Sequence, residues 1–108
     1  MNTVKNYILG NWETGSGSEY TARHAITGAE FATVSSEGID YKSILEYARS
    51  VGGPALRAMT FQERGRMLKA LALHLTSIKG QFYDMSWATG ATKVDSWIDI
   101  EGGIGNLF

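Results

Sequence analysis

The pattern of apolar and polar positions divides the chain into a strand-rich beginning and a longer helical part. Apolar residues in Asn6–Trp12 are bounded by polar ones and predict a short strand. A Gly/Ser-rich loop follows at Glu13–Ser18. The stretches EYTARHAI and AEFATV flank Thr27–Gly28 and predict a β-hairpin. We therefore expect strands and a hairpin over residues 1–38.

Residues 39–108 show the apolar spacing of helices. Asp40 is placed to cap the first helix, and Gly52–Gly53 is expected to end it. The apolar face of this helix consists of Ile44, Leu45, Ala48 and Val51. Strands followed by about four helices define an α+β order of elements. A lone hairpin is marginal in water, so these strands need a larger sheet or a helix layer to lie on.

The second helix has the clearest start signal in the chain. Thr60 and Glu63 form the T-x-x-E pattern of a capping box, in which each side chain accepts a hydrogen bond from a backbone amide of the other residue. Five apolar residues then recur at helical spacing, namely Met67, Leu68, Leu71, Leu75 and Ile78. We expect Gly80 to end this helix, and a shorter helix to run from Gln81 to about Thr89 and close at Gly90.

The last predicted helix begins near Val94 or Asp95 and continues to Phe108. One side of it carries Val94, Trp97, Glu101, Ile104 and Phe108, and a narrow second strip carries Ile98, Gly102 and Gly105. Each interior glycine costs about 1 kcal/mol relative to alanine, which a short isolated helix cannot absorb. We therefore expect the chain to be cut from a longer polypeptide whose downstream part covers this helix.

The glycine-rich end has two alternatives to a helix. A disordered tail is the first, and the high apolar content of Gly102–Phe108 argues against it. A dinucleotide-binding loop is the second, and it fails on spacing. The G-x-G-x-x-G pattern would need a glycine where Phe108 stands, and no strand precedes the segment.

Composition excludes several classes of function. A net charge of −1 in 108 residues gives no electrostatic basis for binding nucleic acid or an anionic membrane. The start of the chain is too polar for a secretory signal, and no apolar run approaches the length of a membrane span. The chain has no cysteine, so it holds no disulfide, no zinc thiolate and no thiol nucleophile. We expect a cytoplasmic protein.

Several stretches resemble, in family order, the beginning of an aldehyde dehydrogenase. The family patterns are an F-I-x-G-x-W strand, an N-P-A-T-G-E hairpin, an A-x-x-A-R helix, an E-R-x-x-x-L helix and an E-T-G-K turn. The matching stretches are Tyr7–Trp12, His24–Glu30, Tyr47–Arg49, Glu63–Leu68 and Ala88–Ala91. The chain departs from the family where His24-Ala25 replaces Asn-Pro and where Ala91 replaces lysine.

A narrower resemblance points to one branch of that family. The stretches HAITGAE, GGPALRAMTFQERGRMLKALALHL and TGATKVDSWIDIEGGIGNLF resemble the bifunctional ring-cleavage and aldehyde dehydrogenase proteins of bacterial phenylacetate degradation. In those proteins a second, hydratase-like domain opens the oxepin-CoA ring. A sister branch, which acts on the semialdehyde of aerobic benzoyl-CoA degradation, is similar as well. The resemblance implies that residues 1–108 are the amino-terminal fragment of an α/β aldehyde dehydrogenase domain and not a complete catalytic domain.

The same resemblance implies the chemistry of the parent enzyme. A cysteine thiolate attacks the aldehyde, a hydride passes to NADP, and a glutamate activates the water that releases the acid. The substrate would be a CoA-thioester semialdehyde, and the parent is expected to be a homo-oligomer. This segment lacks both a cysteine and a βαβ unit for the cofactor. We therefore expect no catalytic and no cofactor-binding residue in it, no activity of the segment alone, and a scaffold role beside the cofactor-binding domain.

One metal site is implied by the resemblance. Some family members hold a monovalent cation near the hairpin, and by spacing the carboxylate would be Asp99 and the backbone carbonyls would be those of Ala22 and Arg23. The alternative is that Asp99 caps a helix, pairs with a cation or faces solvent.

The remaining candidates each have a plain structural alternative. A basic stretch could contact the phosphates of CoA or form a solvated helix face with Glu63; it consists of Arg57, Arg64, Arg66 and Lys69. His24 and His74 lack a second ligand at metal-binding spacing. Trp97 and Phe108 could line a binding groove, but their spacing is typical of interdomain core. An independent interaction module that docks a partner through its last helix remains the competing function.

Overall fold

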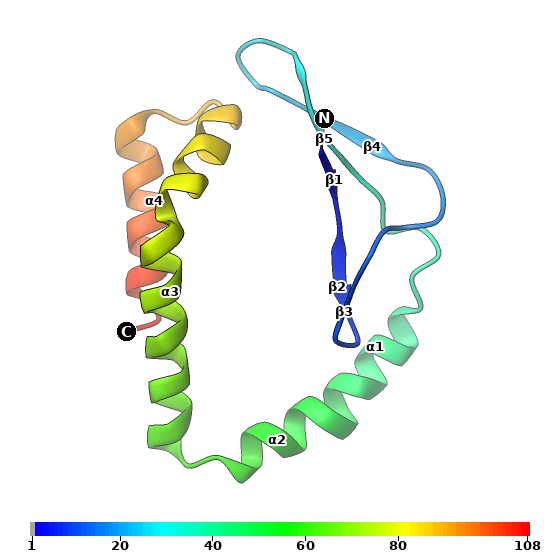
Figure 1. The fold of residues 1–108 in the computed structure, drawn as a ribbon, viewed down its shortest axis with the longest axis vertical. Coiled ribbons are helices and arrows are strands. Elements are labelled where there is room, and N and C mark those ends of the chain that lie inside the picture. The colour runs from blue at the N-terminus through cyan, green and yellow to red at the C-terminus, as the bar shows by residue number, and fades with distance from the viewer. Residues whose placement is uncertain (1) are drawn as a thin grey trace. The chain divides into compact units, whose positions relative to one another are not determined.

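The computed structural model describes residues 2–108 and confirms the α+β class (Figure 1). The chain forms two compact units, of which the first ends at Ala58 and the second is Met59–Phe108. All of the described strands belong to the first unit, together with the first helical stretch. The second unit is a pair of helices.

The first unit contains a three-stranded sheet. Its strand order is β1 (Asn2–Val4), β5 (Glu30–Val34) and β4 (Tyr20–Arg23). The antiparallel pairing of β4 with β5 confirms the predicted hairpin. The parallel pairing of β1 with β5 was not predicted, because it joins Thr3 to Thr33 across 30 positions of sequence. Long-range pairing of this kind leaves no local sequence signal.

The predicted single strand at Asn6–Trp12 is wrong. The segment folds back on itself as β2 (Asn6–Ile8) and β3 (Asn11–Glu13), which pair antiparallel. The two turn residues, Leu9 and Gly10, both have positive φ, at 51° and 84°. Positive φ at both central positions is the geometry of a type I′ hairpin turn, for which leucine is an uncommon first residue. The turn therefore could not be recognised from its composition.

Asp40 caps the first helix as predicted. The helix α1 (Tyr41–Tyr47) begins where the Ser43 amide donates to Asp40 Oδ1 at 3.1 Å and the Ser43 hydroxyl donates to Oδ2 at 2.6 Å. The hydroxyl bond is the main reason that the pKa of Asp40 lies below its usual value. Both bonds favour the charged carboxylate and tie the cap to the first helical turn.

The expected end of this helix at Gly52–Gly53 is wrong. The chain continues through a π-helical turn, η1 (Ala48–Gly52), into α2 (Gly53–Ala58). The Gly53 amide donates to the carbonyl of Ala48, five residues earlier. In an α-helix the Pro54 ring would clash with the carbonyl four residues before it, and Pro54 has no N–H to donate. The wider π turn removes the conflict, so the two glycines serve as flexible positions within a helix.

The helix α3 (Phe61–Ala88) begins with the predicted capping box. The Glu63 amide donates to Thr60 Oγ1 at 3.1 Å, and the Thr60 amide donates to Glu63 Oε2 at 2.7 Å. The predicted stop at Gly80 and the separate helix from Gln81 are both wrong, because α3 is continuous through this region. A glycine costs about 1 kcal/mol in a helix, which packing against a neighbouring helix can offset. Gly90, with φ of 88°, follows the end of α3 as expected.

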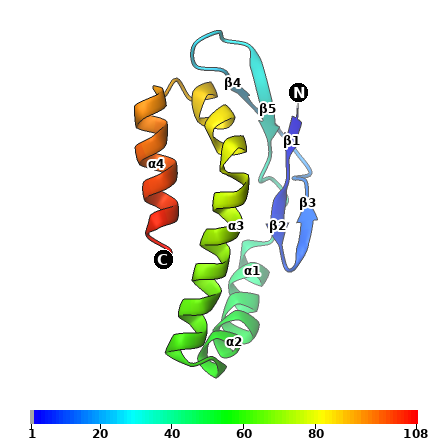
Figure 2. The ribbon, with the colours of Figure 1, turned by 60° about the vertical axis from the view of Figure 1, so that its left-hand side comes forward.

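The final helix α4 (Lys93–Gly105) confirms that the glycine-rich stretch is helical, and the disordered-tail interpretation of that stretch is wrong. Thr92 caps it by accepting a hydrogen bond from the Asp95 amide at 3.2 Å. The helix starts slightly earlier than predicted and ends at Gly105, not at Phe108. In Figures 1 and 2, α4 lies alongside the second half of α3, and the two helices form the core of the second unit.

Candidate functional site

The buried stripe of α4 follows the predicted side only in part, because Ile104 lies in the stripe whereas Trp97 of the same predicted side is exposed. Ser96 and Ile104 are buried, and Ile100 and Leu107 between and beyond them are half-buried. These positions recur at the spacing of one helix face. The small hydroxyl of Ser96 interrupts the apolar pattern of this stripe, so the sequence did not reveal it. The predicted side also contained Val94 and Phe108, and both of these are exposed.

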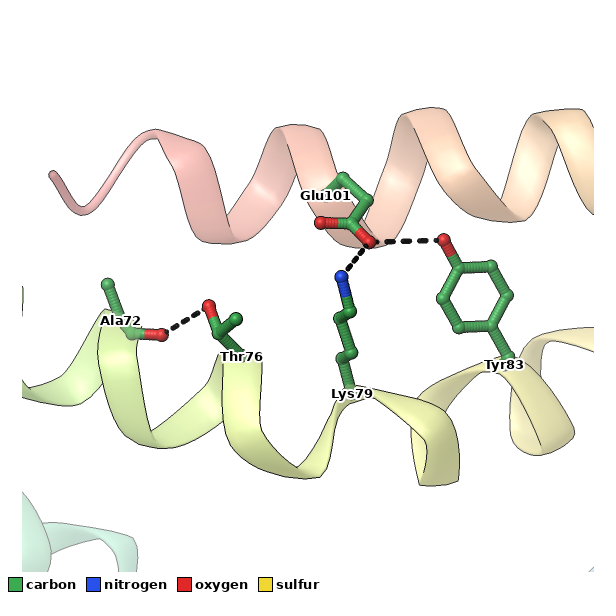
Figure 3. Close-up of polar contacts among 5 residues, drawn as sticks. All are labelled: Ala72, Thr76, Lys79, Tyr83 and Glu101. Carbon is green, nitrogen blue, oxygen red and sulfur yellow. Dashed lines mark hydrogen bonds and ion pairs between the residues drawn. The ribbon is translucent and has the colours of Figure 1, made fainter.

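Three polar side chains connect α4 to α3 (Figure 3). Glu101 Oε1 accepts a hydrogen bond from Lys79 Nζ at 2.7 Å and a longer one from the Tyr83 hydroxyl at 3.4 Å. Hydrogen bonding to Glu101, together with its negative charge, raises the pKa of Lys79. Burial is the main cause of the raised pKa of Tyr83, and the charge of Glu101 adds to it. Both shifts favour the protonated groups seen in this cluster.

A second polar contact between α3 and α4 joins two serine hydroxyls. The hydroxyls of Ser86 and Ser96 are 2.7 Å apart, and the Ser96 side of the contact is buried. Thr76 differs from these side chains because its hydroxyl donates to the Ala72 carbonyl of its own helix at 2.8 Å (Figure 3). Ala72 itself is fully buried, and its small side chain permits close packing at this point of α3. The contacts between the helices fix the register of α4 on α3. Their role is structural rather than catalytic.

Several large apolar residues at α4 are exposed. Trp97 is 59% exposed, Ile98 is 58% exposed, and Phe108 beyond the helix is 65% exposed. Tyr83, Lys93, Val94 and Trp97 line a shallow depression of about 240 Å³. Exposed apolar patches often mark contact sites on soluble proteins. These residues are the strongest candidates for a contact surface in the second unit.

The glycine strip of α4 is open as well. A Cβ atom added at Gly102, Gly103 or Gly105 would have no neighbouring atom within 4 Å. No described residue therefore explains why these positions are glycine, although each one weakens the helix. The absence of side chains leaves a flat strip on which another backbone could lie closely.

The proposed cation ligands fall in different units. Asp99 lies on α4, where it is exposed and lines a pocket of about 310 Å³ with Phe82 and Met85. Ala22 and Arg23 lie at the end of β4, where the pairing with β5 has an irregular register. Among residues 2–108 no hydrogen bond or ion pair joins the Asp99 side chain to another residue. The cation site stays a prediction.

The basic stretch is divided between the two units. Arg57 belongs to the first unit, whereas Arg64, Arg66 and Lys69 are exposed on α3 of the second. The Arg64 guanidinium lies 5.8 Å from the centre of the Phe61 ring, which is a cation–π contact. Glu63, the expected partner of these cations, is engaged in the capping box instead.

His24 follows β4 in the first unit, and His74 is exposed on α3 in the second unit. Across residues 2–108 no group of three or more His, Asp or Glu side chains is placed to hold a metal ion. In the same part of the chain, none of the helices combines the length and the apolar character needed to cross a membrane.

Comparison with known proteins finds a similarity to part of a longer dehydrogenase. No family model matches the chain. Over 102 residues the chain is nevertheless 39% identical to part of an aldehyde dehydrogenase. That relative is the 3,4-dehydroadipyl-CoA semialdehyde dehydrogenase of Aromatoleum evansii. The alignment covers 94% of this chain and 20% of the relative, so the chain spans about a fifth of the length of the protein it matches.

Proposed function

We propose that this chain is the amino-terminal structural part of an NADP-dependent aldehyde dehydrogenase that oxidises a CoA-linked semialdehyde to the acid. The observation that carries the proposal is the 39% identity over nearly the whole chain to one fifth of a dehydrogenase named for a CoA semialdehyde. The resemblance in family order of the hairpin, the capping-box helix and the Thr89-Gly90 turn supports the same class.

The chemistry of the chain supports a structural role for it. Aldehyde oxidation of this kind needs a thiolate nucleophile, and the sequence has no cysteine. A dinucleotide is usually bound at a βαβ unit, in which a helix crosses between two parallel strands. In residues 2–108 the one parallel pair, β1 and β5, is connected through three other strands and no helix. Catalysis and cofactor binding therefore belong to the remainder of the enzyme.

The exposed side of α4 supports a position against further polypeptide. Trp97 and Ile98 are more than half exposed, and the neighbouring glycine strip is uncovered. Burying an aromatic and an aliphatic side chain would each contribute about 1.5–3 kcal/mol, and a flat glycine strip permits close backbone contact. Exposed apolar side chains and a glycine strip open to close contact are both expected of a segment that packs against further polypeptide.

The narrower assignment is to the phenylacetate branch, in which the parent is bifunctional and also carries an oxepin-CoA hydrolase domain. It rests on the likeness of HAITGAE and TGATKVDSWIDIEGGIGNLF to that branch. The relative from Aromatoleum evansii has a different CoA semialdehyde in its name. We propose a cytoplasmic homo-oligomer for the parent, with a monovalent cation near Asp99 as its only metal site within this segment.

The reading frame beyond Phe108 and the activity of the full enzyme test the proposal. We expect a downstream cysteine and glutamate, and NADPH formation when the full protein meets the CoA semialdehyde of either branch. The 108-residue chain alone is expected to give none, and replacement of the downstream cysteine by serine is the matched control. A reading frame without a cysteine nucleophile would contradict the proposal.

The exposed apolar side of α4 also fits an independent interaction module that docks a partner protein. Solution behaviour distinguishes the two functions. A finished module is a well-folded monomer, whereas a scaffold segment separated from its enzyme self-associates or has low stability. Sedimentation of the 108-residue chain at several concentrations measures this difference. A stable monomer with no dehydrogenase sequence downstream would favour the module.

A further inference from the structure

The Gly/Ser-rich segment between β3 and β4 lies against the chain that follows β5. The Ser16 amide donates to the Glu37 carbonyl at 2.9 Å, and the Ser16 hydroxyl donates to the same carbonyl at 3.4 Å. The Ser18 amide donates to Glu37 Oε2 at 2.5 Å. Glu37 therefore binds this segment both through its backbone and through its side chain.

Two glycines allow the segment to approach the chain after β5 this closely. A Cβ added at Gly15 would meet the Ser35 hydroxyl and would lie 2.6 Å from the Ser35 carbonyl oxygen. A Cβ added at Gly17 would meet the carboxyl group of Glu37. A side chain at Gly15 would push two backbones apart, and one at Gly17 would displace the carboxylate that accepts from Ser18.

The same region holds the β2–β3 hairpin in the first unit. The strands β2 and β3 form a two-stranded sheet of their own, apart from the three-stranded sheet. The Asn6 carboxamide of β2 donates to the Ser35 carbonyl at 2.8 Å, and the Gly/Ser-rich segment begins just after β3. The hairpin carries Tyr7 and Trp12, whose ring centres are 5.0 Å apart and which are both exposed. A two-stranded hairpin is marginal in water, so its orientation depends on contacts such as these.

We propose that residues 15–18 are a closed strap, which Glu37 locks in place and which holds the β2–β3 hairpin in one orientation. A Gly/Ser-rich segment is ordinarily a flexible linker. Here the three hydrogen bonds to Glu37 and the glycines that permit close contact fix the segment instead. Glu37 is a positioning residue, because it acts on the hairpin through the strap. The strap lies within the first unit and does not depend on the proposed dehydrogenase function.

Hydrogen exchange of individual amides in the 108-residue chain, measured by NMR, tests the lock. We expect the Ser18 amide to be protected, and Glu37→Ala to lower its protection about tenfold, because a hydrogen bond to a charged acceptor is lost. Glu37→Gln keeps a side-chain oxygen that can accept from this amide and should retain most of the protection. The Ala32 amide, in the central strand β5, is the internal reference and should not change. An unprotected Ser18 amide in the parent chain, or equal protection in the two variants, overturns the proposal.

Residual dipolar couplings of the backbone amides test whether the strap orients the hairpin. One alignment tensor should fit β2, β3 and β5 in the parent chain and in Glu37→Gln. In Glu37→Ala the couplings of the hairpin should shrink while those of β5 remain. Gly17→Ala keeps the carboxylate but displaces it, and should have the same effect. Glu19→Ala removes an exposed carboxylate beside the strap and is the matched control, which should change nothing. Hairpin couplings that stay unchanged in both Glu37→Ala and Gly17→Ala overturn the positioning role.

Discussion

Glu101 of α4 lies 2.7 Å from the ammonium group of Lys79 on α3, and the same carboxylate oxygen accepts from Tyr83. This ion pair joins two helices at positions 22 residues apart in the sequence. The Lys79 and Glu101 side chains are 41% and 28% exposed, so water reaches the pair and weakens it. The contact therefore sets which faces of the helices meet more than it sets how strongly they bind.

The first prediction concerns the alkaline stability of the helix pair. The pKa values of Lys79 and Tyr83 are both raised above their ordinary values of 10.5 and 10.0. A group whose pKa is higher in the folded chain than in the unfolded chain stabilises the fold. This stabilisation is complete at a pH below the unfolded-state pKa and is lost as the pH rises through the folded-state pKa. We expect the melting temperature of the 108-residue chain, measured by circular dichroism, to fall above about pH 10.

Glu101→Gln provides the variant for this prediction. It keeps the shape of the side chain and removes the charge that raises the Lys79 pKa. We expect a lower melting temperature at neutral pH and a smaller further loss above about pH 10. Lys69→Gln, which removes an exposed cation elsewhere on α3, is the control and should keep the alkaline loss of the parent chain. The same alkaline loss in Glu101→Gln would show that the cluster is not its cause.

The second prediction concerns the capping box of α3. Thr60→Ala removes the acceptor for the Glu63 amide and should lower the free energy of unfolding by about 1 kcal/mol. Thr60→Ser keeps the hydroxyl, and Glu63→Gln keeps an oxygen for the Thr60 amide, so both should change stability by less. Urea unfolding of the three variants measures the difference. Equal losses in Thr60→Ala and Thr60→Ser would contradict the capping role.

The third prediction concerns the hydroxyl pair between the helices. Ser96→Ala leaves the Ser86 hydroxyl without its partner in a partly buried position and should cost about 1 kcal/mol. The double variant Ser86→Ala, Ser96→Ala should cost less than the sum of the single changes. Thermal unfolding of all four chains closes this double-mutant cycle. Strict additivity would mean that the two hydroxyls do not interact.

The fourth prediction uses Gly102 to test what covers α4. In the 108-residue chain a Cβ at this position meets no neighbour, so Gly102→Ala should stabilise the helix by about 1 kcal/mol. In the full enzyme the same methyl group would meet the polypeptide that the proposed function places there, and the sign should reverse.

Gly65→Ala on α3 is the matched control for Gly102→Ala, because its added Cβ also has no neighbour within 4 Å. It should stabilise the 108-residue chain by a similar amount. Melting temperatures of the short chain and of the full enzyme, each with and without the two changes, provide the comparison. A gain in the full enzyme from Gly102→Ala would show that the glycine strip is not a contact surface.

Signals confined to a few neighbouring residues were predictable from the sequence. The capping box at Thr60 and Glu63, the Asp40 cap and the hairpin around Thr27–Gly28 each depend on residues that contact one another within a short segment. Their side-chain chemistry specifies the geometry directly. The final helix was predictable for a related reason, since its apolar residues follow helical spacing.

Features that depend on context were missed. Gly80 is a stop signal in an isolated helix, but here α4 packs along α3 and supports it through that residue. Leu9 in a left-handed conformation and the parallel pairing of β1 with β5 leave no local pattern either. At the candidate site, the sequence indicated the exposed aromatic side of α4, whereas the buried stripe through Ser96 required the structure.

The π-helical turn Ala48–Gly52 has a consequence for how this segment tolerates changes in length. A π-helical turn contains one residue more than an α-helical turn. The turn between α1 and α2 therefore corresponds to the insertion of one residue into a regular helix. Deleting one residue from Ala48–Gly52 would turn this segment into a regular α-helical turn. The Pro54 ring would then clash with a backbone carbonyl. Shortened homologues of this helix are therefore expected to have also exchanged that proline.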